Sequence, residues 1–212
     1  MRSISLMLLL LLAAGCVPLS VYPLYTGEDD IVFNETLLGT WQPEKDAQSH
    51  AWTFEPQQDD PRRYTLVVKD ADGRVGRFIA TIVMIDDRWF LDLLPDDVEP
   101  ALQINDWYAL HLLALRSFMR IEVVENRLVL TPPDTKKLIK LLHARRKLIP
   151  HELVITNGGK LTRVLFTADP ASLQAFVAEN LDDPTFFDDH MILMRVGVPA
   201  SRPAGQPTNT AQ

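Results

Sequence analysis

The stretch RRYTLVVKDADGRVGRFIATIVMIDDRWFLDLLP, from Arg62 to Pro95, decides the fold class of this chain. It contains three runs in which apolar side chains recur at every second position, which is the period of a β-strand with one buried face. The members of that face are Tyr64, Leu66 and Val68 in the first run, Phe78, Ala80, Ile82 and Met84 in the second, and Trp89, Leu91 and Leu93 in the third. An Asp-Gly pair at 72–73 tolerates the positive φ of a tight turn, and an acidic pair at 86–87 separates the last two runs. The stretch therefore predicts three consecutive antiparallel strands.

Similar short runs lie on both sides of this stretch, at 37–44, 50–56, 117–125 and 127–133, with a further strand or hairpin over 151–168. Two later segments, 134–148 and 169–181, carry apolar residues at helical spacing and begin with the suitable N-caps Asp134 and Asp169. We expect a mainly β fold of the α+β class. Its seven or eight antiparallel strands form a meander that makes a small barrel or a strongly curved sheet, with two C-terminal helices packed on it. Closure into a barrel would remove exposed strand edges.

The N-terminus has the features of a secretory signal: one positive charge at Arg2, an apolar run from Leu6 to Ala14, and small residues before Cys16. The apolar run is shorter than the roughly 20 residues of a membrane-spanning helix. Cys16 is the only cysteine of the chain. The mature protein is therefore expected to fold without disulfides.

The sequence LAAGC, at 12–16, resembles the lipobox of bacterial lipoproteins. The resemblance implies that Cys16 receives a thioether-linked diacylglycerol and that the signal is removed before it. Two or three acyl chains on one residue anchor a protein stably without a spanning helix. Because Val17 is not an aspartate, the resemblance favours the periplasmic face of the outer membrane in a Gram-negative host. In a Gram-positive host it implies the outer face of the single membrane.

These observations predict four segments: a signal peptide over 1–15, a lipidated tether over 16–33, one globular β-rich domain over 34–196, and a disordered tail over 197–212. The tail is rich in Pro, Ala, Thr and Gln and has too little apolar surface to offset its ordering entropy. Tyr22 and Tyr25 give the tether a means of docking on the domain. Removal of Arg2 leaves a net charge of −8, which argues against nucleic acid or an anionic membrane surface as a partner.

The motif Gly39-Thr40-Trp41, at the start of an expected strand, resembles the first-strand signature of lipocalins and related ligand-binding barrels. The resemblance implies a lipocalin-like barrel whose base is closed by Trp41, with an arginine from a late strand lying across the indole ring. Arg163 is the candidate for that arginine. A cation over an indole face contributes about 0.5–2 kcal/mol. The simpler interpretation of Trp41, an ordinary core residue, buries it as well.

One local cluster combines an acid, two aromatic residues and a histidine: Asp106, Trp107, Tyr108 and His111. At the mouth of a barrel, Trp107, Tyr108 and His111 could bind a ligand together with Trp41, or they could simply pack as a lid. The histidines form no close metal pair at i,i+4, and neither a serine-nucleophile elbow nor a phosphate loop occurs in the sequence. We therefore expect no catalytic residue, metal or cofactor.

The basic run from Lys136 to Lys147 is either a solvated face or a patch for an acidic partner or anionic headgroups. Taken together, the sequence favours a lipid-anchored cell-envelope lipoprotein with a non-catalytic domain that binds an envelope protein or supports envelope structure. The alternative is a lipocalin-like carrier of a small apolar ligand. A hydrolase that uses His111 ranks third.

Overall fold

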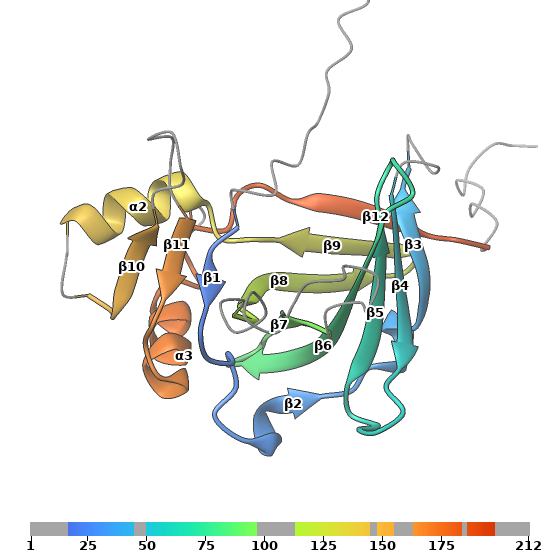
Figure 1. The fold of residues 1–212 in the computed structure, drawn as a ribbon, viewed down its shortest axis with the longest axis horizontal. Helices are drawn as coiled ribbons and strands as arrows, with labels where there is room; N and C mark the ends of the chain where they lie inside the picture. Colours follow the sequence, from blue (N-terminus) through green and yellow to red (C-terminus); the bar gives the residue numbers. More distant parts are fainter. Residues whose placement is uncertain are drawn as a thin grey trace, which may run out of the picture.

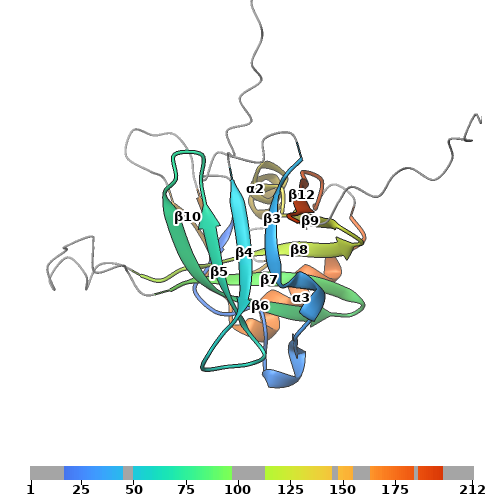
Figure 2. The same ribbon diagram turned by 90° about the vertical axis from the view of Figure 1, so that its right-hand side faces the viewer.

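A closed antiparallel barrel is the centre of the computed structural model, which describes residues 17–44, 50–96, 113–144, 148–154, 163–183 and 186–197. Its eight strands are β3 (Gly39–Pro43), β4 (Ala51–Pro56), β5 (Tyr64–Lys69), β6 (Val75–Ile85), β7 (Arg88–Pro95), β8 (Arg116–Val124), β9 (Arg127–Thr131) and β12 (Met191–Arg195). Strands β3 to β9 form a meander, and β12 closes it by pairing with both β9 and β3. Figure 2 shows β3 to β6 side by side as one curved wall. The expected meander is confirmed, and it forms the closed barrel, which is one of the two forms that the sequence left open.

The barrel interior is built by the alternation that the sequence shows. The faces predicted for β5 and β7 point inward, while Met84 of β6 lies at the end of its strand and is 44% exposed. The buried interior residues are Leu37, Trp41, Phe54, Tyr64, Leu66, Ala80, Ile82, Leu91, Leu93, Met119, Ile121, Leu128, Leu130 and Leu193. Because every second residue of a strand faces the same side, eight short strands suffice to fill this core.

A second region, which we call the wing, packs beside the barrel. It contains β1 (Leu19–Ser20), β10 (His151–Val154), β11 (Arg163–Phe166), α2 (Thr135–Ala144) and α3 (Pro170–Glu179). Figure 1 shows the wing on the left, continuous with the barrel sheet through β1. Strand β8 serves both regions, because Arg116–Ser117 pair with β1 whereas 120–124 pair with β9.

The wing has its own hydrophobic core, which uses the outer face of the barrel. Outward side chains from β6, β7 and β8 meet the wing helices there, and the buried members are Leu24, Val83, Ile85, Phe90, Phe118, Leu138, Leu142, Ile149, Val164, Phe166, Ala168, Leu173, Phe176, Val177, Phe186 and Phe187. The two expected helices are present with their expected caps. Asp134 Oδ1 accepts from the amide of Lys137 at 2.9 Å, and Asp169 Oδ1 accepts from the amide of Ser172 at 3.0 Å.

The segment expected to be a tether is part of the fold from Val17 onward. Residues Leu19 and Ser20 form β1 between β8 and β11, and Leu24 is fully buried in the wing core. The chain then continues through η1 (Glu28–Asp30), β2 (Ile31–Val32), which pairs with β6, and η2 (Glu35–Leu37). Of the two tyrosines, Tyr25 packs against the wing core and Tyr22 is exposed. Residues 198–212 of the expected tail lie outside the described residues.

Candidate functional site

Trp41 lies in the barrel core beside η2, at the end of the barrel where β3 begins, which we call the base. Its side chain is fully buried, and its indole Nε1 donates a hydrogen bond to the carbonyl oxygen of Leu37 at 2.8 Å. The guanidinium carbon of Arg195, at the end of β12, lies 4.2 Å from the ring centroid. The indole is thus satisfied at its N–H and covered by a cation on its face.

Arg195 links β12, the last strand of the barrel, to the segment that precedes β3, the first strand. Its Nη1 donates to the carbonyl of Leu38 at 2.6 Å, and its Nη2 donates to the carbonyl of Thr36. Gly39 begins β3 with φ of +109°, and a Cβ at this position would lie 3.2 Å from Arg195 Nη1. Glycine at 39 therefore allows both the backbone conformation and the close approach of the guanidinium.

The arginine across Trp41 is Arg195 and not Arg163, so that prediction is wrong. Arg163 is exposed and begins β11, in the wing. The error follows from missing β12, the strand that brings Arg195 to the base. The available signal was the short apolar run at 191–194 between an acidic turn and Gly197, which is consistent with a buried strand.

Tyr64 contacts the segment that precedes η2. Its ring stacks on Phe33 with centroids 4.7 Å apart and an interplanar angle of 14°. Its hydroxyl accepts from the amide of Asn34 at 2.6 Å and donates to the carbonyl of Asn34 at 3.1 Å. Burial raises the pKa of Tyr64 to about 12, with the Asn34 backbone hydrogen bond opposing that rise. The phenol is therefore a neutral structural group at any ordinary pH.

Bulky side chains occupy the interior above this base. Trp41, Phe54 and Tyr64 are among the largest fully buried residues of the protein, and all three belong to the barrel core. An eight-stranded barrel is just wide enough either to be filled by side chains or to hold one small ligand. In the described part of the chain, bulky side chains of the protein itself occupy the barrel interior.

A buried carboxylate joins the barrel to the wing. Asp92 of β7 is 1% exposed, and its Oδ1 accepts from Arg116 Nη1 at 2.5 Å while its Oδ2 accepts from the amide of Leu24 at 2.8 Å. Desolvation raises the pKa of Asp92, an effect that the charges of Arg116 and Arg63 and the Leu24 amide partly offset. The ring of Tyr25 covers the guanidinium groups of Arg116 and Arg63. The distance from its ring centroid to the guanidinium carbon is 5.7 Å for Arg116 and 5.5 Å for Arg63. The carboxylate is sealed from solvent, and its hydrogen bonds link β7 to β8 and to the segment that contains Leu24.

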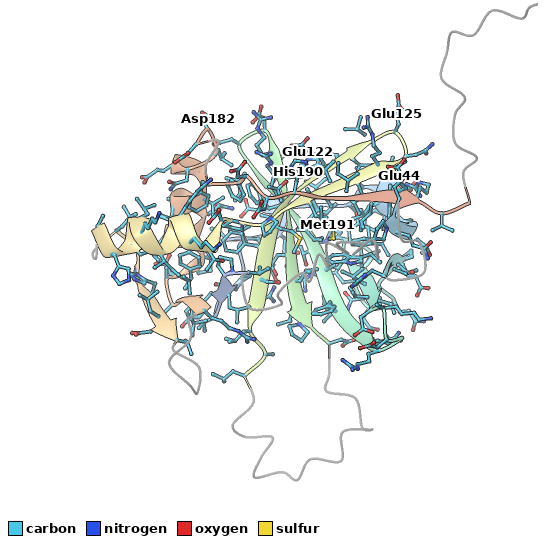
Figure 3. The ribbon with its side chains drawn as sticks, turned by 90° about the horizontal axis from the view of Figure 1, so that it is seen from above. Glu44, Glu122, Glu125, Asp182, His190 and Met191 are labelled. Atoms are coloured by element: carbon cyan, nitrogen blue, oxygen red, sulfur yellow. The ribbon has the colours of Figure 1, made fainter. Side chains whose placement is uncertain are left out.

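A shallow groove of about 190 Å³ lies on the outside of the barrel, where the wall meets the segment that precedes β12. Its lining residues are Arg120, Glu122, Val129, Thr131, Phe187, His190 and Ile192. Seen from above in Figure 3, Glu122 and His190 lie beside each other next to β12. We call this feature the outer groove.

Charged and apolar groups alternate within the outer groove. Arg120 Nε lies 3.3 Å from Glu122 Oε1, and the Arg120 guanidinium carbon lies 5.7 Å from the ring centroid of Phe187. Ile192 is 42% exposed although it sits in a strand paired on both sides. Such a surface suits a partner that contributes an apolar side chain together with polar groups.

Several predicted site residues lie outside the described residues: Cys16, Trp107, Tyr108 and His111. Of the others, Gly39 and Trp41 are brought together at the base, and Arg163 is separate from them. Within the described part of the chain, no group of three or more His, Cys, Asp or Glu could hold a metal ion. Nor is any helix there long and apolar enough to cross a membrane.

Compared with known proteins, the chain matches no family model, and no significant match is found among curated proteins or solved structures.

Proposed function

We propose that this protein is a lipid-anchored protein of the bacterial cell envelope whose barrel binds an envelope protein through the outer groove and performs no catalysis. The observation that carries the proposal is the contrast between the two sides of the barrel wall. The inner side is packed with the protein's own bulky side chains, whereas the outer side at β8, β9 and β12 presents a groove with an exposed Ile192.

The anchoring part of the proposal rests on the lipobox-like sequence that ends at Cys16. Pro18 is buried and Leu19 belongs to β1, so the folded domain begins immediately after the cysteine. A lipid on Cys16 would hold the barrel close to the bilayer surface, where membrane-associated proteins are within reach.

The groove part of the proposal rests on its chemistry. Arg120 and Glu122 compensate each other, so the groove does not demand a charged partner, and the ring of Phe187 with Val129 and Ile192 provides apolar contact. Interfaces of this composition, apolar at the centre and polar at the rim, are typical of protein partners.

The test is photo-crosslinking in intact cells with a photoreactive amino acid at Ile192. The matched control is Val75, an aliphatic residue of β6 that is 49% exposed and remote from the groove in sequence and strand order. We expect a discrete crosslinked protein from position 192 and none from position 75. No adduct at 192, or the same adducts at both positions, would reject the groove as a partner site.

The anchor is tested separately with Cys16→Ser. We expect this variant to accumulate as an unprocessed precursor that incorporates no labelled fatty acid. Normal cleavage and export of the variant would contradict the lipidation of Cys16 while leaving the groove experiment interpretable.

A carrier of a small apolar ligand is the second candidate, and the base geometry favours it. Gly39, Trp41 and an arginine across the indole reproduce the arrangement that the lipocalin resemblance implies, with Arg195 in the arginine's place. The half-buried residues Trp52, Val68 and Phe78 pack against the barrel core. Native mass spectrometry of the detergent-free mature protein tests this candidate, because a carrier would retain a bound small molecule.

A further inference from the structure

The positive charge of this chain is concentrated in one segment. Eight of the 21 lysines and arginines, but one of the 28 acidic residues, lie between Thr135 and Arg163. This segment therefore has a net charge of +7 in a chain whose net charge is −7. A segregation of this size creates a field that a uniformly mixed surface lacks.

The segment lies where the chain leaves the expected anchor. Strand β1 runs parallel to β11 with Leu19 opposite Leu165 and Ser20 opposite Phe166. Two residues before Leu19, Val17 therefore reaches the level of Arg163, the exposed first residue of β11. In Figure 1, α2 lies at the same upper side of the wing as the start of β1. The described basic parts of this segment, α2 and Arg163, thus lie on the same side of the wing as Val17, the first described residue.

Helix α2 turns a cationic face outward. Leu138 and Leu142 are buried on its inner side, while Lys136, Lys140 and His143 are exposed on the opposite side at helical spacing. No acidic residue occurs between Thr135 and Ala144. Lys137, the remaining lysine, bonds to Asp188 at 2.9 Å and is directed to the protein.

The distance to the bilayer is set by the short connection. Only Val17 and Pro18 lie between Cys16 and Leu19, and the three residue steps of an extended chain span at most about 10 Å. The Debye length at physiological ionic strength is about 8 Å. Charges on the wing near the start of β1 are therefore within electrostatic reach of lipid headgroups, whereas the far side of the barrel is not.

We propose that the exposed face of α2, together with Arg163, rests on the anionic headgroups of the membrane that holds the lipid on Cys16. This inference depends on the proposed lipid anchor, which brings the surface to the bilayer. The contact orients the domain, since one anchor alone allows rotation about its attachment point. It turns the remainder of the mature chain, whose net charge is −15 after the removal of Arg2, away from the headgroups.

The experiment uses the full-length protein, purified from its own membranes and reconstituted in vesicles. One vesicle is phosphatidylcholine alone, and the other also contains phosphatidylglycerol. A single cysteine is introduced and labelled with a fluorophore, either by Ala144→Cys at the exposed end of α2 or by Asp29→Cys in η1, at the lower side of Figure 1. Energy transfer to headgroup-labelled lipid then reports which side of the domain faces the bilayer.

We expect several-fold higher transfer from position 144 than from position 29 in the anionic vesicles, since opposite sides of a domain of this size lie roughly 40 Å apart. The difference should fall by at least half in phosphatidylcholine and in a Lys136→Glu, Lys140→Glu background. The matched control is Arg88→Glu with Arg127→Glu, two exposed arginines at turns of the barrel, which changes the net charge equally and should keep the full difference.

Failure of the orientation and failure of the anchor give different results. Wild-type protein carries no free thiol if Cys16 is lipidated, so labelling of the wild type would contradict the anchor itself. If the wild type takes no label and energy transfer is equal from positions 144 and 29, the anchor stands and the proposed orientation is overturned. If charge reversal on α2 leaves the transfer unchanged but removes crosslinks to an acidic envelope protein, the surface binds that protein and the lipid assignment is overturned.

Discussion

The barrel and the wing are assembled from the same sheet by different rules. In the barrel, consecutive strands pair with their neighbours in sequence, and each strand supplies alternate residues to one interior. In the wing, β1 brings residues 19–20 beside residues 165–166, and the core combines Leu24 with Phe90 and Phe176. The difference shows that one strand can contribute to two cores. Where the wing covers the outside of the barrel, the outward side chains of a strand are as buried as its inward ones.

The sharpest test of this comparison uses two adjacent residues of β7 that point into different cores, Leu91 into the barrel and Phe90 into the wing. We expect Leu91→Ala and Phe90→Ala each to lower the free energy of unfolding by about 3–5 kcal/mol, because each leaves a cavity in a packed core. The measurement is urea unfolding, with the exposed Val75→Ala as the control that changes stability by about 0.5 kcal/mol or less.

The same experiment decides whether the two cores unfold together. Of the four tryptophans, Trp41 belongs to the barrel core and Trp52 and Trp89 pack against it, whereas both described α-helices belong to the wing. Tryptophan fluorescence therefore reports the barrel, and circular dichroism at the helix band reports the wing. We expect coincident transitions, since β7 and β8 are shared. Separate midpoints would show that the wing is an independent unit.

The fastening between the regions is tested by Arg116→Ala. This change leaves the Asp92 carboxylate buried without its closest cation, so we expect the free energy of unfolding to fall by about 3 kcal/mol. This value is at the low end for broken buried pairs, because the Leu24 amide and the charge of Arg63 remain near Asp92. Arg88→Ala, which removes an exposed pair with Asp87, is the control and should cost about 0.5 kcal/mol or less. Equal effects of the two changes would remove the special role of the Asp92 pair.

The barrel base is tested by its alkaline stability. The unfolded chain loses the Tyr64 proton near pH 10, whereas the folded protein keeps it to about pH 12. Stability from this group is therefore complete below pH 10 and falls between pH 10 and 12, by roughly 2–3 kcal/mol. In Tyr64→Phe this part of the decline should vanish, as measured by unfolding at a series of pH values. An unchanged decline in the variant would show that other groups cause it.

The smallest expected effect compares Arg195, which lies over the Trp41 ring, with Arg163, which the sequence predicted for that place. Arg195→Ala removes a cation over the indole and hydrogen bonds to two carbonyls, so we expect a cost of about 1–2 kcal/mol. Arg163→Ala, in the wing, should change stability by about 0.5 kcal/mol or less. Thermal unfolding followed by tryptophan fluorescence compares them, and the reverse order would contradict the observed base.

Prediction from the sequence succeeded where the signal is local. The strands from 51 to 131 and the caps Asp134 and Asp169 follow from residue alternation and from polar side chains next to helix starts. It failed at β1, β2 and β12, which have two to five residues and no alternation to detect. Those strands exist because a neighbouring strand offers unpaired backbone groups, which is a property of the assembled sheet.

The candidate site was accessible to sequence reasoning only in part. Gly39 and Trp41 were identified because a three-residue motif carries them, but the partner of Trp41 depended on which late strand closes the barrel. The outer groove could not be predicted at all, because Arg120, Phe187 and Ile192 come from β8, from the segment after α3 and from β12.

By itself, the sequence determined the meander, the two capped helices and the concentration of positive charge in one segment, since alternation, capping and charge are properties of neighbouring residues. The tertiary structure alone decided that β12 closes the barrel, that Arg195 covers Trp41, and that Asp92 is sealed between barrel and wing. These features join residues far apart in the chain, and only packing of the two cores brings their atoms into contact.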